Sequence, residues 1–140
     1  MRFGESKSQP RAPISMNLPS DCQFTRHDQW IRREGDILTL GVTDYGQNEL
    51  GELFFVEFPA PGARVAAGQS FGAVESVKSV SELVSPVAGE IVAVNDAVAQ
   101  NPSLVNESPY ERGWLVRVQI EPAALPSDLM DAAQYAAFRS

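Results

Sequence analysis

The stretch that decides the fold is GAVESVKSVSEL, residues 72–83, with Lys78 near its centre. A Ser-Val pair stands on each side of the lysine, and the segment predicts two strands that meet at a polar turn. A solvated surface role is the default interpretation of a lysine. The hairpin favours another, because a swinging-arm carrier needs a primary amine at a rigid, accessible turn. Acylation of that amine removes its charge and leaves a tether that reaches on the order of 10 Å or more.

Apolar patterning outside this hairpin predicts a mainly β protein. Residues 53–58 are apolar on both faces, which predicts a central strand. Further strands are expected at residues 24–33, 37–42, 69–75, 89–94 and 114–120, with a tight turn at Gly35-Asp36. The last of these runs alternates, and one of its faces holds Trp114, Val116, Val118 and Ile120. The expected core includes Phe54, Phe55, Val92, Trp114 and Val116, and we expect the protein to fold before any modification of Lys78.

Three segments carry helix signals. Asp44 is expected to cap a short helix that runs to Leu50 and ends at Gly51. Residues 101–109 predict a loop or a short helical piece. Ser127 is expected to cap a C-terminal helix, because apolar residues follow it at roughly helical spacing.

The sequence also contains two segments that resemble each other. Residues 51–57 (GELFFVE) resemble residues 89–95 (GEIVAVN), and a turn-rich segment with small residues follows each. Two similar halves predict a sandwich with internal two-fold symmetry, and Lys78 lies between them. Chance similarity between two apolar strands is the alternative explanation.

Composition excludes several function classes. The chain has 140 residues and a formal net charge of −7, with 11 basic and 18 acidic side chains, which disfavours nucleic-acid binding. The single cysteine, Cys22, rules out an internal disulfide and favours a reducing compartment. The single histidine, His27, is expected at a surface or strand edge. One His and one Cys do not make an ordinary zinc site or an obvious nucleophilic site, so we expect a protein that is not an enzyme and holds no metal.

The chain ends suggest one domain behind a tail. We expect residues 1–22 to be a flexible N-terminal tail and residues 23–140 to form a single domain. No apolar run approaches the ~18 residues of a membrane helix, so no membrane association is expected. Residues 1–15 have no apolar core of a secretory signal. They are expected to be a disordered tail, or alternatively the remnant of an organellar transit peptide.

Several short motifs occur in order along the chain. The lysine motif is ESVK (75–78), followed by SPVAGE (85–90). Supporting pieces are GVTDYGQ (41–47), LGEL (50–53), VEFP (56–59), NPSLVN (101–106), PY (109–110) and GWL (113–115). Together, these motifs resemble the H protein family of the glycine cleavage system, and the resemblance runs from about Phe24 to Phe138. It implies the family's fold, a barrel-sandwich hybrid with two related halves, here with a C-terminal helix and short helical turns.

The resemblance also implies a function. Such a protein carries lipoate as an amide on the lysine that matches Lys78, and it is a carrier subunit without catalysis of its own. The lipoyl disulfide accepts the aminomethyl group of glycine from a pyridoxal-phosphate decarboxylase and meets an aminomethyltransferase. A dihydrolipoamide dehydrogenase then reoxidises the dithiol. Glu75, Ser76, Val77 and Glu82 are expected to present the hairpin to these partners and to lipoylating enzymes. The implied location is the bacterial cytoplasm, or alternatively the mitochondrial matrix.

The sequence departs from the family at Gln29. The family has His-Glu-Trp where this chain has Asp28-Gln29-Trp30, and His27 is displaced by one position. In the family the loaded arm is thought to fold into a cleft where acidic groups meet its amine. A neutral amide adds no charge attraction, so Gln29 places the strength of arm docking in question, and Glu82 remains as an acidic partner. On this interpretation, Gln29→Glu slows loss of the loaded group.

Two kinds of alternative remain open, and the first is a different carrier. A biotinyl carrier usually places methionines beside its lysine, whereas Lys78 has Val77 and Ser79. A 2-oxoacid dehydrogenase lipoyl domain usually shows Asp-Lys at the turn and is shorter. The second kind is an H-like protein that only relays lipoate to other enzymes, or an unmodified binding module. The same lysine and hairpin serve relay and glycine cleavage alike.

Overall fold

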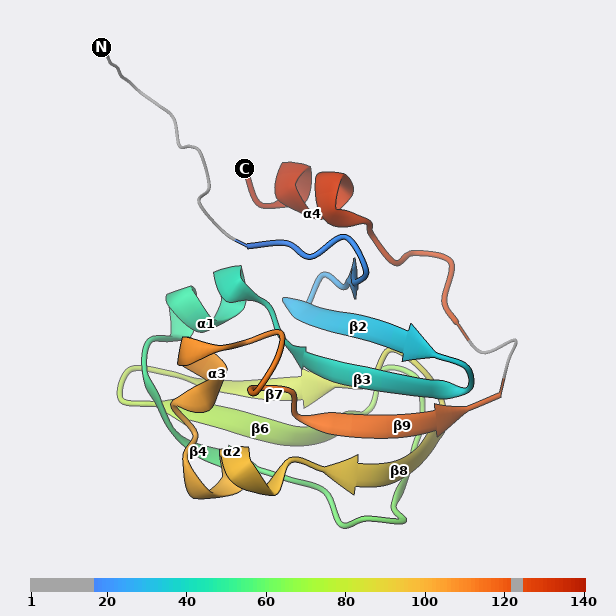
Figure 1. The fold of residues 1–140 in the computed structure, drawn as a ribbon, viewed down its shortest axis with the longest axis horizontal. Coiled ribbons are helices and arrows are strands. Elements are labelled where there is room, and N and C mark those ends of the chain that lie inside the picture. The colour runs from blue at the N-terminus through green and yellow to red at the C-terminus, as the bar shows by residue number, and fades with distance from the viewer. Residues whose placement is uncertain (1–16, 122–124) are drawn as a thin grey trace.

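The computed structural model describes residues 17–121 and 125–140, and its strands form two antiparallel sheets (Figure 1). The larger sheet has the order β1-β2-β3-β9-β8-β5, and the smaller sheet has the order β4-β6-β7. The larger sheet consists of β1 (Gln23–Phe24), β2 (Gln29–Glu34), β3 (Ile37–Val42), β9 (Val116–Ile120), β8 (Gly89–Val94) and β5 (Arg64–Val65). The smaller sheet consists of β4 (Leu53–Glu57), β6 (Ser70–Ser76) and β7 (Val80–Val84). The predicted β sandwich with a C-terminal helix is confirmed.

The main core lies between the two sheets. The larger sheet contributes Ile31, Leu38, Leu40, Val65, Ile91, Val116, Val118 and Ile120. The smaller sheet contributes Leu53, Val56, Phe71, Val74 and Leu83. Alternation along β9 buries Val116, Val118 and Ile120, as the sequence predicts.

A second buried cluster lies beneath the C-terminal helix, α4 (Ala132–Phe138). It contains Cys22, Phe24, Trp30, Tyr110, Met130 and Tyr135. Cys22 and the partly buried Leu18 both pack here, so part of the described segment 17–22 contacts the domain. The prediction of a flexible tail otherwise falls on residues 1–16, which lie outside the described residues.

Two helices have caps other than the ones that the sequence predicts. The first helix, α1, spans Asp44–Leu50 and ends at Gly51, but Thr43 caps it, because its hydroxyl accepts the Gly46 N–H. The predicted cap at Ser127 is wrong. Asp131 caps α4 in a reciprocal pair with Gln134, and that pair satisfies two backbone N–H groups. The helical piece in 101–109 is confirmed as α3 (Leu104–Glu107), and α2 (Asp96–Gln100) was not predicted.

The predicted central position of residues 53–58 is wrong, because β4 is an edge strand of the smaller sheet. A bulge between Leu53 and Phe55 adds one residue to β4. Phe54 and Phe55 are therefore 57% and 50% exposed, not part of the core. A continuous apolar run does not distinguish a strand with two covered faces from a bulged strand that exposes adjacent apolar side chains.

Two further core predictions are also wrong. Val92 is 41% exposed at a second bulge, between Ile91 and Ala93 of β8. Trp114 precedes β9 and is half-buried, with the Arg117 guanidinium 3.9 Å from its ring centroid. Of the five residues, only Val116 is fully buried.

The two bulges support the predicted internal relation. The similar segments 51–57 and 89–95 form β4 and β8, which lie in different sheets. Within these segments Phe54 and Val92 occupy equivalent positions, and each stands at the extra residue of its bulge. Similar sequences therefore produce the same local backbone irregularity in both halves.

Candidate functional site

Lys78 lies at the turn between β6 and β7, as the sequence predicts. The turn closes through the Ser76 N–H, which donates to the Ser79 carbonyl at 2.8 Å. Glu75 and Val80 form the last paired positions before it. Val77 is 94% exposed and Lys78 is exposed beside it. The amine is therefore held at the end of a paired hairpin and is open to solvent.

The other hairpin residues divide into buried and accessible ones. Ser76 is buried, and its hydroxyl approaches the Ser79 carbonyl at 3.4 Å. Glu75 is half-buried on the middle strand of the smaller sheet, and Glu82 is exposed on β7. Ser76 thus supports the turn from inside, while Val77 and Glu82 are accessible to a partner.

The end of α1 supports the lysine side chain. Gly51 has φ +86°, a conformation that favours glycine, and a Cβ placed there would lie 3.5 Å from the Lys78 Cε. Asn106 holds this segment, because its amide donates to the Gly51 carbonyl and accepts the Leu53 N–H, each at 2.9 Å. The role of Asn106 was not predicted, since 55 residues separate it from Gly51. Only the NPSLVN motif, residues 101–106, signalled its region.

A cleft of about 110 Å³ opens between α1, β7 and the β1–β2 turn. Glu49 and Leu50 line it from α1, and Glu82 lines it from β7. Gln29 lies on its inner wall. Since Leu50 directly precedes Gly51, the cleft is adjacent to the Lys78 side chain. The structure thus brings the predicted docking residues Gln29 and Glu82 to one cleft.

Both polar atoms of the Gln29 amide are hydrogen-bonded within the protein. Gln29 is 2% exposed, and its Nε2 donates to the Val84 carbonyl at 2.7 Å. Its Oε1 accepts the Val84 N–H at 2.8 Å. The side chain therefore joins β2 to the end of β7, and a carboxylate here would lose the donor that faces the Val84 carbonyl.

Asp28, beside Gln29, is also bonded within the protein. It has φ +60°, and the Arg139 guanidinium donates to both of its carboxylate oxygens at 2.8 and 2.7 Å. The buried Tyr135 hydroxyl donates to Asp28 at 2.7 Å, so the Thr43 hydroxyl must donate to Tyr135 in turn. Burial raises the pKa of Tyr135, which keeps the hydroxyl protonated. This chain of bonds ties α4 to the cleft wall.

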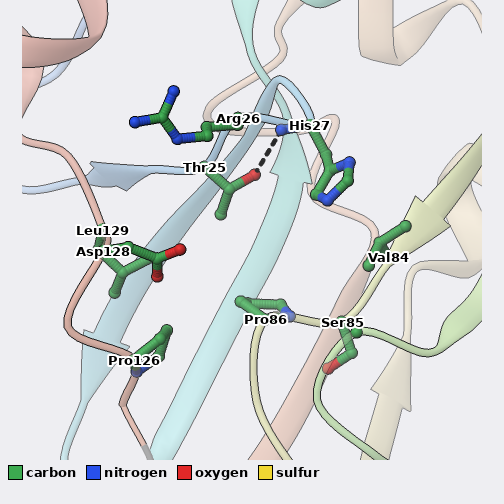
Figure 2. A pocket seen from close by; sticks show the side chains of 10 residues that line it. Thr25, Arg26, His27, Val84, Ser85, Pro86, Pro126, Asp128 and Leu129 are labelled. Atoms are coloured by element: carbon green, nitrogen blue, oxygen red, sulfur yellow. Dashed lines mark hydrogen bonds between the residues drawn. The ribbon is translucent and has the colours of Figure 1, made fainter.

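A larger cavity of about 240 Å³ lies on the other side of His27 (Figure 2). Four segments line it: the β1–β2 turn, Gly68 between β5 and β6, the end of β7 with the connection after it, and residues 126–129. Figure 2 shows the His27 N–H donating to the Thr25 hydroxyl across the turn, at 3.2 Å. His27 is exposed, as predicted. Lys78 lines neither this cavity nor the smaller cleft, but Leu50 of the smaller cleft is the chain neighbour of Gly51, which lies near the Lys78 side chain.

The remaining reactive groups lie away from the lysine. Cys22 is 4% exposed in the second cluster, and burial raises the pKa of its thiol to about 12. Within residues 17–121 and 125–140, no group of three or more His, Cys, Asp or Glu side chains is placed to hold a metal ion. No helix in the same ranges is long and apolar enough to cross a membrane.

The fold and the site define a class: a two-sheet β protein that presents one lysine at an exposed hairpin turn, beside a small acidic cleft. Comparison with known proteins gives the family. The family model described as glycine cleavage H-protein matches residues 22–140. This chain belongs to that family, whose members are the lipoyl carriers of the glycine cleavage system.

Individual relatives agree with the family model. A glycine cleavage system H protein of Nitratidesulfovibrio vulgaris is 48% identical over 120 residues, which cover 86% of this chain and 93% of that protein. One from Bacteroides thetaiotaomicron is 45% identical over 122 residues, covering 87% and 97%. A crystal structure of the Mycobacterium marinum glycine cleavage system H protein matches with TM-score 0.80 and 38% identity, covering 87% and 98%.

Proposed function

We propose that Lys78 is the residue on which this chain carries lipoate, as an amide of its side-chain nitrogen. The observation that carries the proposal is the exposed amine at the closed β6–β7 turn. The sequence contains only one other lysine, Lys7, which lies outside the described residues. The position fits the group, because an acyl chain on this amine would begin in solvent and have a cleft beside it.

The chain's own role is to present the group, and the partner enzymes supply the catalysis. When bound, the lipoyl group supplies a disulfide that accepts the aminomethyl group of glycine. The expected partners are the glycine decarboxylase, the aminomethyltransferase, the dihydrolipoamide dehydrogenase and a lipoylating enzyme. Serine, valine and glutamate flank Lys78 in the turn, with no histidine among them to activate a serine, and Cys22 is buried elsewhere. The bacterial relatives favour a bacterial cytoplasmic location over the mitochondrial matrix.

The cleft between α1 and β7 is the proposed docking place of the arm. Its amine cargo needs an acidic partner, and Gln29 is neutral and bonded to Val84. Asp28 is held by Arg139. Glu49 and Glu82, both exposed, line the cleft from opposite walls. These two carboxylates therefore replace the acid that the family places at the position of Gln29.

Reconstitution tests the function directly. The lipoylated chain is mixed with purified decarboxylase, aminomethyltransferase and dihydrolipoamide dehydrogenase, with glycine, tetrahydrofolate and NAD. We expect NADH to form at a rate that rises with the concentration of the chain, and Lys78→Arg to abolish it. A lipoylated chain that supports no NADH formation, yet passes its lipoyl group to another acceptor protein, would favour the relay alternative.

A further inference from the structure

The outer face of the smaller sheet carries apolar side chains next to Lys78. The register places Phe55, Glu75 and Val80 side by side across β4, β6 and β7. Directly paired residues point to the same face, and that face is the outer one, because the neighbouring row, Val56 and Val74, is buried. Phe55 and Val80 are 50% and 61% exposed. With Phe54 at the bulge and Val77 at the turn, they form what we name the hairpin face.

This face has an acidic border. Glu75 lies between Phe55 and Val80 in the same row. The next row on the same face lies two residues farther from the turn. It places Glu57 and Glu82 on either side of Ala73, and both glutamates are exposed. A partner that covers the face must therefore offer an apolar centre with basic side chains around it.

The length of the Lys78 side chain, before and after acylation, indicates which partner must contact this face. An unmodified lysine side chain extends about 6 Å from its Cα, so an enzyme that acylates Lys78 must contact the turn itself. Once the arm is attached, it reaches on the order of 10 Å or more, and later enzymes can act at its far end. Of the proposed partners, the acylating enzyme is the one that must cover the residues around Lys78.

We propose that the hairpin face, formed by Phe54, Phe55, Val77 and Val80, is the docking surface for the enzyme that acylates Lys78. This inference rests on the proposed function. The co-reactant is an activated lipoyl group in a mixed anhydride with phosphate, such as an acyl adenylate. The Lys78 amine attacks its carbonyl carbon, a C–N bond forms as the C–O bond to the phosphate breaks, and the nucleotide leaves with its electron pair. The amine nitrogen releases one proton to solvent.

The test measures acylation of the purified apoprotein by a lipoate ligase supplied with lipoate and ATP. Val80→Ser and Phe55→Ser remove apolar contacts from the face. Val92→Ser is the matched control, because Val92 is a similarly exposed bulge residue on the other sheet. We expect kcat/KM for acylation to fall about tenfold or more in the two face variants, chiefly through KM, and to stay near wild type in the control. Thermal unfolding checks that each variant folds.

A second measurement separates acylation from later steps. Each variant is lipoylated to completion with excess ligase, and glycine decarboxylase activity is then measured with it. We expect near wild-type activity, since the arm reaches beyond the face. Wild-type acylation kinetics in both folded face variants, or an equal loss in Val92→Ser, would overturn the inference. If the wild-type protein is not acylated on Lys78 at all, the proposed function fails instead.

Discussion

The amide of Gln29 joins the two sheets, because β2 carries the side chain and its partner, Val84, ends β7. In Gln29→Glu, an ionised carboxylate would face the Val84 carbonyl in a buried position. We expect the variant to lose about 1–3 kcal/mol of unfolding free energy at pH 8. Burial should raise the pKa of the new carboxyl in the folded state, so stability should be higher near pH 5 and decline as pH rises.

Urea unfolding of the wild type and of Gln29→Glu from pH 5 to pH 8 measures this loss of stability. Gln29→Glu was expected from the sequence to improve arm docking, but the structure indicates that it weakens the sheet contact first. A variant as stable as wild type across this pH range would contradict the structural role of the amide. For docking itself, Glu82→Gln and Glu49→Gln are the informative changes, because both residues line the cleft.

The two tryptophans differ in environment, and their replacements should differ in effect. Trp30 is fully buried, its Nε1 donates to the Pro109 carbonyl at 2.9 Å, and its ring fills the space above Gly41. Trp30→Ala should cost about 3–5 kcal/mol of unfolding free energy. Trp114→Ala should cost about 1 kcal/mol, mainly the Arg117 contact. Denaturant titration compares the two variants, and equal losses would contradict the difference in burial between the two rings.

Local sequence was sufficient to place only some residues of the candidate site. The places of Lys78 at the turn and of Glu82 on the following strand were predictable, because a hairpin motif is read from consecutive residues. The bonding of Gln29 was not, since Val84 lies 55 residues away. Glu49 was missed for a similar reason: a single acidic residue on a short helix is usually a solvated one, and only the fold places β7 opposite it.

Among the elements, α4 is attached to the core by polar contacts of Arg139 and Tyr135 with Asp28 and by an aromatic stack. Arg139 donates to Asp28, and the Tyr135 ring stacks on Phe24 with centroids 5.0 Å apart. The side chains of Arg139 and Asp28 are only 25% and 24% exposed. Their pair should therefore contribute more than an ordinary surface ion pair.

Arg139→Ala should lower the unfolding free energy by about 1–2 kcal/mol. It should also increase amide hydrogen exchange in the β1–β2 turn, because Asp28 loses its guanidinium partner. The control is Arg112→Ala, which breaks the exposed pair with Glu107 and should change stability by under ~0.5 kcal/mol. Equal effects of the two changes, or unchanged exchange in the turn, would contradict the proposed attachment.

Elements were predictable where a periodic pattern or a turn signal marked them. The β2–β3 hairpin around Gly35 and the alternation of β9 are examples. The bulges in β4 and β8 were not, because an extra residue leaves the apolar run unchanged while it turns Phe54 and Val92 to solvent. The start of α4 was missed because both Ser127 and Asp131 are good caps, and only Asp131 has Gln134 placed to complete the pair.

For the whole molecule, the similarity of residues 51–57 to residues 89–95 predicted two related halves. The structure places the strands that these segments form, β4 and β8, in different sheets. The sheet order itself was not predictable, since β3 pairs with β9 across the sequence. The residues of the main core lie between the sheets, and Lys78 is not one of them. We therefore expect the apoprotein to be folded before acylation, which keeps the turn rigid when the acylating enzyme binds.

Attachment of a lipoyl group to Lys78 is tested by the mass of the intact protein after incubation with lipoate, ATP and a lipoate ligase, followed by peptide mapping. We expect a mass increase of one lipoyl amide, located on the peptide that contains Lys78 and absent in Lys78→Arg. A lipoyl group on Lys7, a modification that persists in Lys78→Arg, or no increase in mass would contradict it.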